Sequence, residues 1–389
     1  MECLLEELAQ WKDMEALKEH MYTTYCIQIK WDDKRILLRY RKEDGADMTS
    51  PLVQCCRSLI VDRLSSTPKP VCRTFSAKQE YDMFREENEY SSVTVSPYYD
   101  GTMINVYNIL GKWYHSTKGM LDANKAYWTS SQSFGELFQD ASGGLPYDLL
   151  DTLDPELCYS FVLQHPENRI VTPIDAPRVV LVLVLNRITG ESIPLIDLPK
   201  ELWTEQIHAA EVSTESYANY EELETAVQGM SGVFLTGPSG HTRLMSPEYS
   251  IVAGLRGNSP NHTHNLLENI NEGSTRRNLY LHYYPEDSSE LLELQQFQEQ
   301  LLLDTEMYYK KIYIENKYTT MPPYIQKWVH DIHRRNRHRS NRSDSTDLHR
   351  FIKGVYHSLP LPRRAYLIKG VQAQLSDMSV VKEEGTLPL

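Results

Sequence analysis

The sequence predicts an α+β protein in which antiparallel sheets with helices are followed by an all-α region. Short runs of alternating or β-branched apolar residues crowd the first 250 positions and are separated by turn residues. After about residue 255 the chain changes to long segments rich in Leu, Glu, Gln, Lys and Arg, which favour helices. The 389 residues also exceed the roughly 250–300 over which a single core grows. We therefore expect two domains, 1–254 and 255–389, the second ending in a polar tail.

The individual elements follow from local patterns. Leu4, Leu8, Trp11, Leu17 and Met21 recur at helical spacing and predict one amphipathic helix over 2–21. Runs typical of strands follow at 25–29, 36–40, 58–62, 103–107, 112–115, 179–185, 232–235 and 241–245. The run 179–185 is apolar without alternation, so we expect a strand that is buried on both faces. Leu-rich and Arg-rich segments predict helices over 290–309 and 322–335.

Composition excludes several classes of protein. No stretch approaches the ~20 apolar residues of a membrane span. The start of the chain is acidic where a secretory signal is basic, and the six cysteines form no Cys-x-x-Cys pair. We therefore expect an intracellular protein, cytoplasmic or nuclear, with no membrane partner. The formal charge of -13 disfavours nucleic-acid binding over the whole surface, so a polyanion needs a local basic site.

Six short segments follow one another along the first domain, at 56–62, 98–104, 116–119, 160–171, 231–234 and 243–249. In their order and spacing the chain resembles the ATP-dependent RNA ligase family of T-even bacteriophages, and the resemblance extends over the helical C-terminal region. It implies a nucleotidyltransferase (RNA/DNA ligase-like) fold in which ATP sits between two β-sheets. In that family a lysine of a Lys-x-Asp-Gly motif takes AMP and passes it to an RNA 5′-phosphate, which a 3′-hydroxyl then seals.

The chain departs from this pattern at the reacting groups. Tyr98 stands at the position of the nucleophilic lysine, Val162 and Ser231 stand at those of metal-supporting glutamates, and Met245 stands at that of a phosphate-gripping lysine. A phenol with a pKa near 10 is ionised about one part in a thousand at neutral pH, so Tyr98 needs a base or a metal to attack. Valine and serine do not ligate a divalent cation as carboxylates do. We therefore expect no catalytic group and no metal ligand.

The binding half of the site is retained. By the same resemblance, the nucleotide-binding residues are Arg57, Lys78, Asp100, Gly101, Lys118 and Arg243. Lys78 matches only if one residue is inserted before it. Each also has an ordinary interpretation: Asp100-Gly101 by itself is a turn, and Lys118 before Gly119 is a common hairpin residue.

The sequence therefore predicts an RNA-ligase-like pseudoenzyme that binds ATP or RNA ends without sealing them. One alternative is an active ATP-dependent RNA ligase or adenylyl transferase with unusual site residues, which needs Mg²⁺. Another is a scaffold for a protein partner that retains only the fold.

A basic tract lies apart from these motifs in the predicted helical domain. Five arginines fall within nine residues of an otherwise acidic chain: Arg334, Arg335, Arg337, Arg339 and Arg342. The planar guanidinium binds phosphates through paired donors, which favours an RNA contact here. A solvated helix end is the alternative interpretation of such a charge run.

Overall fold

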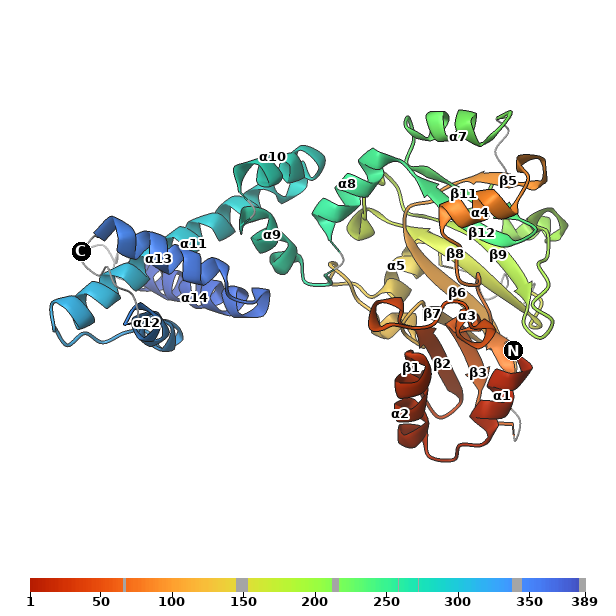
Figure 1. Ribbon diagram of the computed structural model, residues 1–389, viewed down its shortest axis with the longest axis horizontal. Coiled ribbons are helices and arrows are strands. Elements are labelled where there is room, and N and C mark those ends of the chain that lie inside the picture. The colour runs from red at the N-terminus through yellow and green to blue at the C-terminus, as the bar shows by residue number, and fades with distance from the viewer. Residues whose placement is uncertain are drawn as a thin grey trace. The chain divides into compact units, whose positions relative to one another are not determined.

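The computed structural model describes residues 1–65, 68–144, 153–211, 217–257, 259–271, 273–337 and 345–384. It divides into two compact units, Met1–Ala253 and Gly254–Leu389. The two units meet between Ala253 and Gly254, one residue before the boundary expected between residues 254 and 255. Figure 1 shows the first unit as sheets with helices and the second as helices, so the prediction of an α+β class with antiparallel sheets is confirmed.

The N-terminal sheet has the order β1-β2-β3-β4 and is antiparallel. Its strands are β1 (Ile27–Trp31), β2 (Arg35–Tyr40), β3 (Arg57–Asp62) and β4 (Pro70–Cys72), with the short helix α3 (Pro51–Cys55) before β3. The single helix predicted over 2–21 is wrong: two helices, α1 (Glu2–Ala9) and α2 (Met14–Tyr25), occupy this segment. The side chain of Asp13 accepts from the amides of Glu15 and Ala16, so it starts a new helix there. Both helices still bury their leucines against this sheet.

The second sheet has the order β10-β9-β8-β6-β7, and every neighbouring pair is antiparallel except β10 with β9. Its members are β6 (Thr102–Ile109), β7 (Lys112–Thr117), β8 (Leu157–Gln164), β9 (Arg178–Asn186) and β10 (Ile207–Ala209), with α5 (Phe134–Ala141) packed on it. The predicted hairpin is present as β6 and β7, which turn at Gly111 with a φ of 81°. The prediction that β9 is buried on both faces is wrong at Val182 and Leu183, which are half-buried because they line a cleft.

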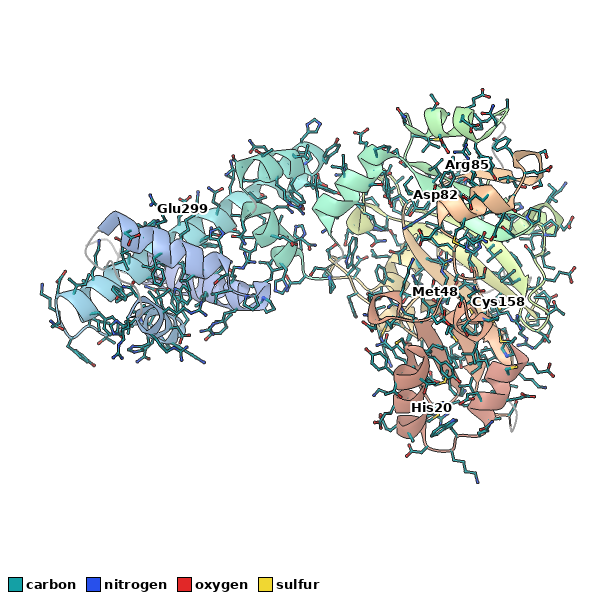
Figure 2. The ribbon with its side chains drawn as sticks, viewed as in Figure 1. His20, Met48, Asp82, Arg85, Cys158 and Glu299 are labelled. Atoms are coloured by element: carbon teal, nitrogen blue, oxygen red, sulfur yellow. The ribbon has the colours of Figure 1, made fainter. Side chains whose placement is uncertain are left out.

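The first two sheets share a buried cluster, which includes Leu37 and Ile60 from the N-terminal sheet and Tyr107 and Cys158 from the second. Cys158, labelled in Figure 2, donates its thiol to the carbonyl of Val71 at 3.5 Å. The N-terminal sheet is thereby packed against the second sheet.

The third sheet is antiparallel, with the order β12-β11-β5. It comprises β5 (Thr94–Pro97), β11 (Gly232–Gly237) and β12 (Gly240–Met245), and the helices α4 (Tyr81–Glu87) and α7 (Tyr220–Val227) contribute to its core. Since β5 pairs with β11, the residues that follow β5 are placed beside the start of β11: the amide of Tyr98 donates to the carbonyl of Gly232 at 3.1 Å. The helix α8 (Pro247–Arg256) follows β12.

The described part of the C-terminal unit consists of helices and their connections, without a strand. Its helices are α9 (His262–Asn271), α10 (Ser274–Tyr283), α11 (Ser288–Tyr309), α12 (Pro323–Asn336), α13 (Ser345–His357) and α14 (Leu361–Glu384). A π-helical turn, Lys310–Ile314, continues α11. The buried Trp328 donates to the hydroxyl of Thr305 at 3.0 Å and ties α12 to α11, whereas Glu299, labelled on α11 in Figure 2, is exposed. No helix in the described parts of the chain is long and apolar enough to cross a membrane.

Candidate functional site

A cleft of about 1470 Å³ opens in the first unit and is lined by residues of all three sheets. Small-molecule sites typically measure roughly 300–1,000 Å³, so this cleft has room for a nucleotide together with part of a longer ligand. One part of its lining is apolar and includes Val182, Ile193, Leu195 and Trp203. The other part holds most of the basic residues.

The charged side chains that line the cleft are all positive. The lining residues that the structure describes include no Asp or Glu and five cations, which are Arg57, Lys78, Lys118, Lys200 and Arg243. The chain as a whole carries a formal charge of -13. A cleft lined by one sign of charge focuses the field and concentrates ions of the opposite sign. This cleft therefore attracts anions on a protein that otherwise repels them.

A β-bulge sets the position of Arg57. Along β3, Leu59 pairs with Leu38 but Arg57 pairs with Arg39, so Ser58 is an extra residue. Its φ of 61° lies in the left-handed region, and its hydroxyl donates to the carbonyl of Lys118 at 2.9 Å. Such bulges bend a strand and redirect its side chains. The bulge thus brings the start of β3 to the end of β7 and places both cations on the cleft.

Arg57 is held by two contacts. Its Nη1 donates to the carbonyl of Ser76 at 2.8 Å and lies 3.3 Å from Nε2 of His241. A guanidinium only donates, so Nε2 of His241 is the acceptor and the ring proton sits on Nδ1. Burial, then the charge of Arg57, lowers the pKa of His241 to about 4. The imidazole is therefore neutral at physiological pH and leaves the positive charge on Arg57.

Lys118 carries a perturbed amine although part of its side chain is exposed to the cleft. Desolvation is the largest cause that lowers its pKa to about 8, and the charges of Arg57, Arg39 and Arg243 add to it. Desolvation and neighbouring cations also lower the pKa of Lys78. An anion bound among these cations would relieve both effects.

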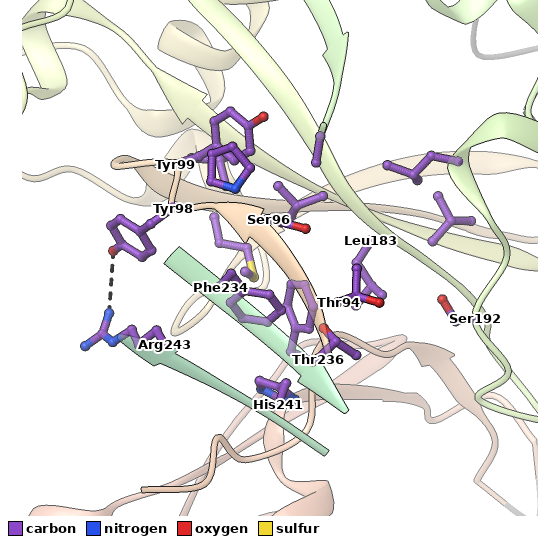
Figure 3. Close-up of a pocket in the computed structure, with 18 of the residues that line it drawn as sticks. Thr94, Ser96, Tyr98, Tyr99, Leu183, Ser192, Phe234, Thr236, His241 and Arg243 are labelled. Atoms are coloured by element: carbon purple, nitrogen blue, oxygen red, sulfur yellow. Dashed lines mark hydrogen bonds between the residues drawn. The ribbon is translucent and has the colours of Figure 1, made fainter. Parts of the chain in front are cut away.

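An aromatic cluster lies beside the cations. The ring centroids of Phe75 and Phe234 are 4.9 Å apart, and each lies 5.3 Å from that of His241. Figure 3 shows Phe234 and His241 on neighbouring strands of the cleft wall. Sequence reasoning assigned no role to these three rings or to Trp203. Phe234 and His241 lie on the two strands of the β11–β12 hairpin, and Phe75 joins them from a distant part of the chain.

Tyr98 lies at the rim between β5 and β6. Arg243 donates to its hydroxyl at 3.5 Å, the long limit of a hydrogen bond, as the dashed line in Figure 3 marks. The guanidinium carbon lies 5.9 Å from the ring centroid of Tyr98, and the ring meets Tyr249 edge to face at 5.5 Å. The phenol is thus positioned by aromatic and cationic contacts.

Asp100 is turned away from the cleft. It is 4% exposed, and its Oδ2 accepts from the amides of Val171 and Thr172, both at 2.8 Å. Its Oδ1 accepts from the hydroxyl of Tyr249 at 2.6 Å, and burial raises the pKa of that phenol so that it remains a donor. The carboxylate therefore fastens the loop before β6 to two other segments.

Gly101 is required by a close approach to β8. A Cβ at this position would lie 2.3 Å from the carbonyl oxygen of Leu163 and 2.7 Å from Cγ1 of Val162. Gly101 and Val162 line the cleft. Ser231 and Met245 are not among its lining residues: the Ser231 hydroxyl lies 3.3 Å from that of Thr172, and Met245 borders Gly232.

The candidate residues therefore separate into two groups. Arg57, Lys78, Tyr98, Gly101, Lys118, Val162 and Arg243 line one cleft. Asp100, Ser231 and Met245 lie outside its lining. In the part of the chain that the structure describes, no group of three or more His, Cys, Asp or Glu side chains is placed to hold a metal ion.

The basic tract lies in the C-terminal unit. Arg334, Arg335 and Arg337 are exposed at the end of α12, and Arg334 pairs with Asp331 at 3.0 Å. Beside them the ring of Tyr313 stacks on His333 at a centroid distance of 3.6 Å. The remaining two arginines of the prediction, Arg339 and Arg342, lie outside the described residues.

Comparisons with known proteins were made by sequence and by structure. Neither a protein-family model nor a curated protein matches the chain. An archaeal ATP-dependent RNA ligase is similar at 10% identity and a TM-score of 0.42, over 90% of this chain and 77% of that one. An Aquifex aeolicus protein described as an ATP-dependent DNA ligase is similar at 13% identity and a TM-score of 0.44, over 74% and 81%. A Naegleria gruberi RNA ligase solved with PPi is similar at 10% identity and a TM-score of 0.34, over 45% and 56%. These three solved structures are RNA and DNA ligases, each at low sequence identity to this chain.

Proposed function

We propose that the first unit is a nucleotidyltransferase-fold pseudoenzyme whose cleft binds a nucleoside triphosphate, or the phosphorylated end of an RNA, without a covalent step. One observation carries the proposal: five cations and no carboxylate among the described residues that line the cleft, in a chain of formal charge -13. Phosphate is the biological anion that such a cluster of Arg and Lys side chains binds best.

Different residues of the cleft lining suit different parts of such a ligand. Arg57, Lys118 and Arg243 supply charged donors for the phosphates. The rings of Phe75, Phe234 and His241 supply apolar faces for a base, and stacking on such rings is worth about 1–3 kcal/mol per base. Binding of ATP or of an RNA end requires nothing else from the protein.

The groups for phosphoryl transfer do not fit the same cleft. Covalent nucleotidyl transfer needs a nucleophile that is ionised or deprotonated and a divalent cation on the phosphates. The loop before β6 presents the phenol of Tyr98, and β8 presents the aliphatic Val162. Mg²⁺ is held by carboxylates, and the described lining offers none. The described lining of the cleft therefore does not fit a divalent cation.

The absence of covalent chemistry gives the first prediction. Purified protein incubated with α-labelled ATP and Mg²⁺ or Mn²⁺ is expected to carry no label after denaturation. Two substitutions identify the source of any label that does appear. Loss of label in Tyr98→Phe would identify the phenol as nucleophile, and loss in Lys118→Arg would identify the perturbed amine. Either result would contradict the pseudoenzyme proposal.

The lowered pKa of Lys118 gives a pH dependence of binding. The pKa of Lys118 is lowered to about 8, so at a lower pH the amine is charged and attracts phosphate. At a higher pH the amine is neutral. We expect the affinity for ATP to fall between pH 7.5 and 9.5, a window in which the phosphate, with a second pKa of about 6, is already fully ionised. Because a bound phosphate raises the pKa of Lys118, the fall extends above pH 8.

A conservative variant isolates the contribution of Lys118. Lys118→Arg keeps its charge over this window and should flatten the profile measured by isothermal titration calorimetry. A profile equally steep in wild type and in Lys118→Arg would show that Lys118 does not contact the phosphates.

We also propose that the arginines at the end of α12 contact RNA phosphates, since three of them are exposed beside a stacked Tyr-His pair. Replacing Arg334, Arg335 and Arg337 with alanine should weaken RNA binding and reduce the slope of log affinity against log salt by up to about 2, at roughly 0.7 per phosphate contact on a single strand. An unchanged affinity and salt slope would show that the tract is only a solvated helix end.

A further inference from the structure

A second group of basic side chains lies in the C-terminal unit, where α13 ends and α14 begins. Tyr356 and His357 close α13, and Arg364 lies in the first turn of α14. Tyr356 is 0% exposed and Arg364 is 9% exposed. Four buried atoms of these three side chains have no hydrogen-bond partner among the described residues: Oη of Tyr356, Nε2 of His357, and Nε and Nη1 of Arg364.

The three side chains act on one another electrostatically. The charge of Arg364 bears on both Tyr356 and His357, and burial is the main cause that lowers the pKa of Arg364 and of His357. Lys353, exposed one turn before His357, adds a further positive charge. Glu268 on α9 is the carboxylate whose charge acts on Arg364, yet no ion pair within 4 Å joins the two in the described structure.

This arrangement is unfavourable in three respects. A buried polar group without a partner costs free energy, and a buried charge without one costs more. The first turn of a helix is also the positive end of its dipole, where acidic residues are favoured. The first turn of α14 instead contains Arg363 and Arg364 and has no acidic residue. Where several unfavourable features of this kind occur together, a bound ligand or a function commonly offsets their cost in free energy.

We propose that Tyr356, His357 and Arg364 form a binding site for a phosphate group, separate from the cleft of the first unit. An oxyanion accepts from the Nε hydrogen of Arg364, which carries a full positive charge, and from the hydroxyl of Tyr356. The neutral imidazole donates from Nε2 when its proton sits there. The dipole of α14 adds to the attraction. The phosphate comes either from inorganic phosphate or from an RNA backbone.

The site is tested on the full-length chain by the arginine Hε–Nε resonances of ¹⁵N-arginine-labelled protein. The resonance that is missing in Arg364→Met identifies Arg364. We expect this resonance to shift saturably with inorganic phosphate, with a short RNA, or with both, and the pattern distinguishes the two sources. Acetate should not reproduce the shift. An Arg364 resonance that does not respond to phosphate or to RNA, or that responds equally to acetate, would overturn the proposal.

Three variants separate this site from its surroundings. Tyr356→Phe keeps the buried ring and removes one hydrogen bond, so it should weaken the response about tenfold. Arg363→Met, one residue away and stacked on Tyr366, should leave the response intact. The cleft variant with Arg57→Ala and Lys118→Ala should also leave it intact, so failure of the cleft proposal and failure of this one are distinguishable.

The thermal stability of the variant gives a second readout. Arg364→Met removes a buried charge that has no partner among the described residues, so in phosphate-free buffer it should melt above wild type. Phosphate should then raise its Tm less than it raises that of wild type, because only the cleft still binds it. A variant that melts below wild type while phosphate raises its Tm as much as that of wild type would show that Arg364 has only a structural role.

Discussion

Replacing Arg57 and Lys118 together with alanine should reduce the affinity of the protein for ATP by at least about 100-fold. A hydrogen bond to a charged group contributes about 1.5–3 kcal/mol, so losing two costs about 3 kcal/mol or more, and each 1.4 kcal/mol is a factor of ten. Neither side chain is part of a sheet core, and both line the cleft. Isothermal titration calorimetry with ATP measures the change.

A matched double variant controls for net charge. Lys12 and Lys125 are exposed, and neither lines the cleft. Replacing both with alanine changes the formal charge by the same amount and should leave the affinity within about twofold, because charges beyond the Debye length of about 8 Å are screened at physiological salt. Equal losses in the two double variants would mean that ATP responds only to overall charge, and no loss in either would remove the cleft as its binding site.

The second large effect concerns stability. Asp100→Ala removes the acceptor for the amides of Val171 and Thr172 and for the hydroxyl of Tyr249. A buried donor left without a partner costs about 1–3 kcal/mol, and the two amides are only half-buried, so we expect the free energy of unfolding to fall by about 3 kcal/mol. Urea denaturation of the purified variant measures this change.

Two further variants locate the effect. Tyr249→Phe removes one of the three hydrogen bonds and should cost about 1 kcal/mol. Asp33→Ala alters an exposed carboxylate and should change stability by less than about 0.5 kcal/mol. If Asp100→Ala unfolded at the same urea concentration as wild type but bound ATP more weakly, its carboxylate would belong to the ligand site and the structural role assigned here would be wrong.

Local patterns in the sequence were sufficient to predict many of the helices and strands. The alternation on either side of Gly111 predicts the β6–β7 hairpin, and the Leu-rich run over 290–309 predicts α11. The same reasoning failed at residues 10–13, where helical periodicity continues but Asp13 starts a new helix by capping it. Periodicity reports which side of an element is buried, and it is insensitive to a short break between two elements that bury the same side.

Fewer features of the candidate site than of the fold could be predicted from the sequence. The resemblance to a ligase family selected Arg57, Lys118 and Arg243, and all three line one cleft. It did not select Phe75 or His241, because no motif contains them. It also included Asp100, whose carboxylate is turned into the protein. A motif records which residues recur together and does not record which of them faces a ligand.

By itself, the sequence determined the α+β class, the change to helices near residue 255 and most strand positions, because these depend on spacings within a few residues along the chain. The tertiary structure alone decided that Arg57 enters the cleft through the bulge at Ser58 and that three rings gather beside it. It also decided that Nε and Nη1 of Arg364 are buried without a partner among the described residues. These features arise from pairing and packing between residues far apart in the chain, and their free energies depend on distances and burial that no local pattern encodes.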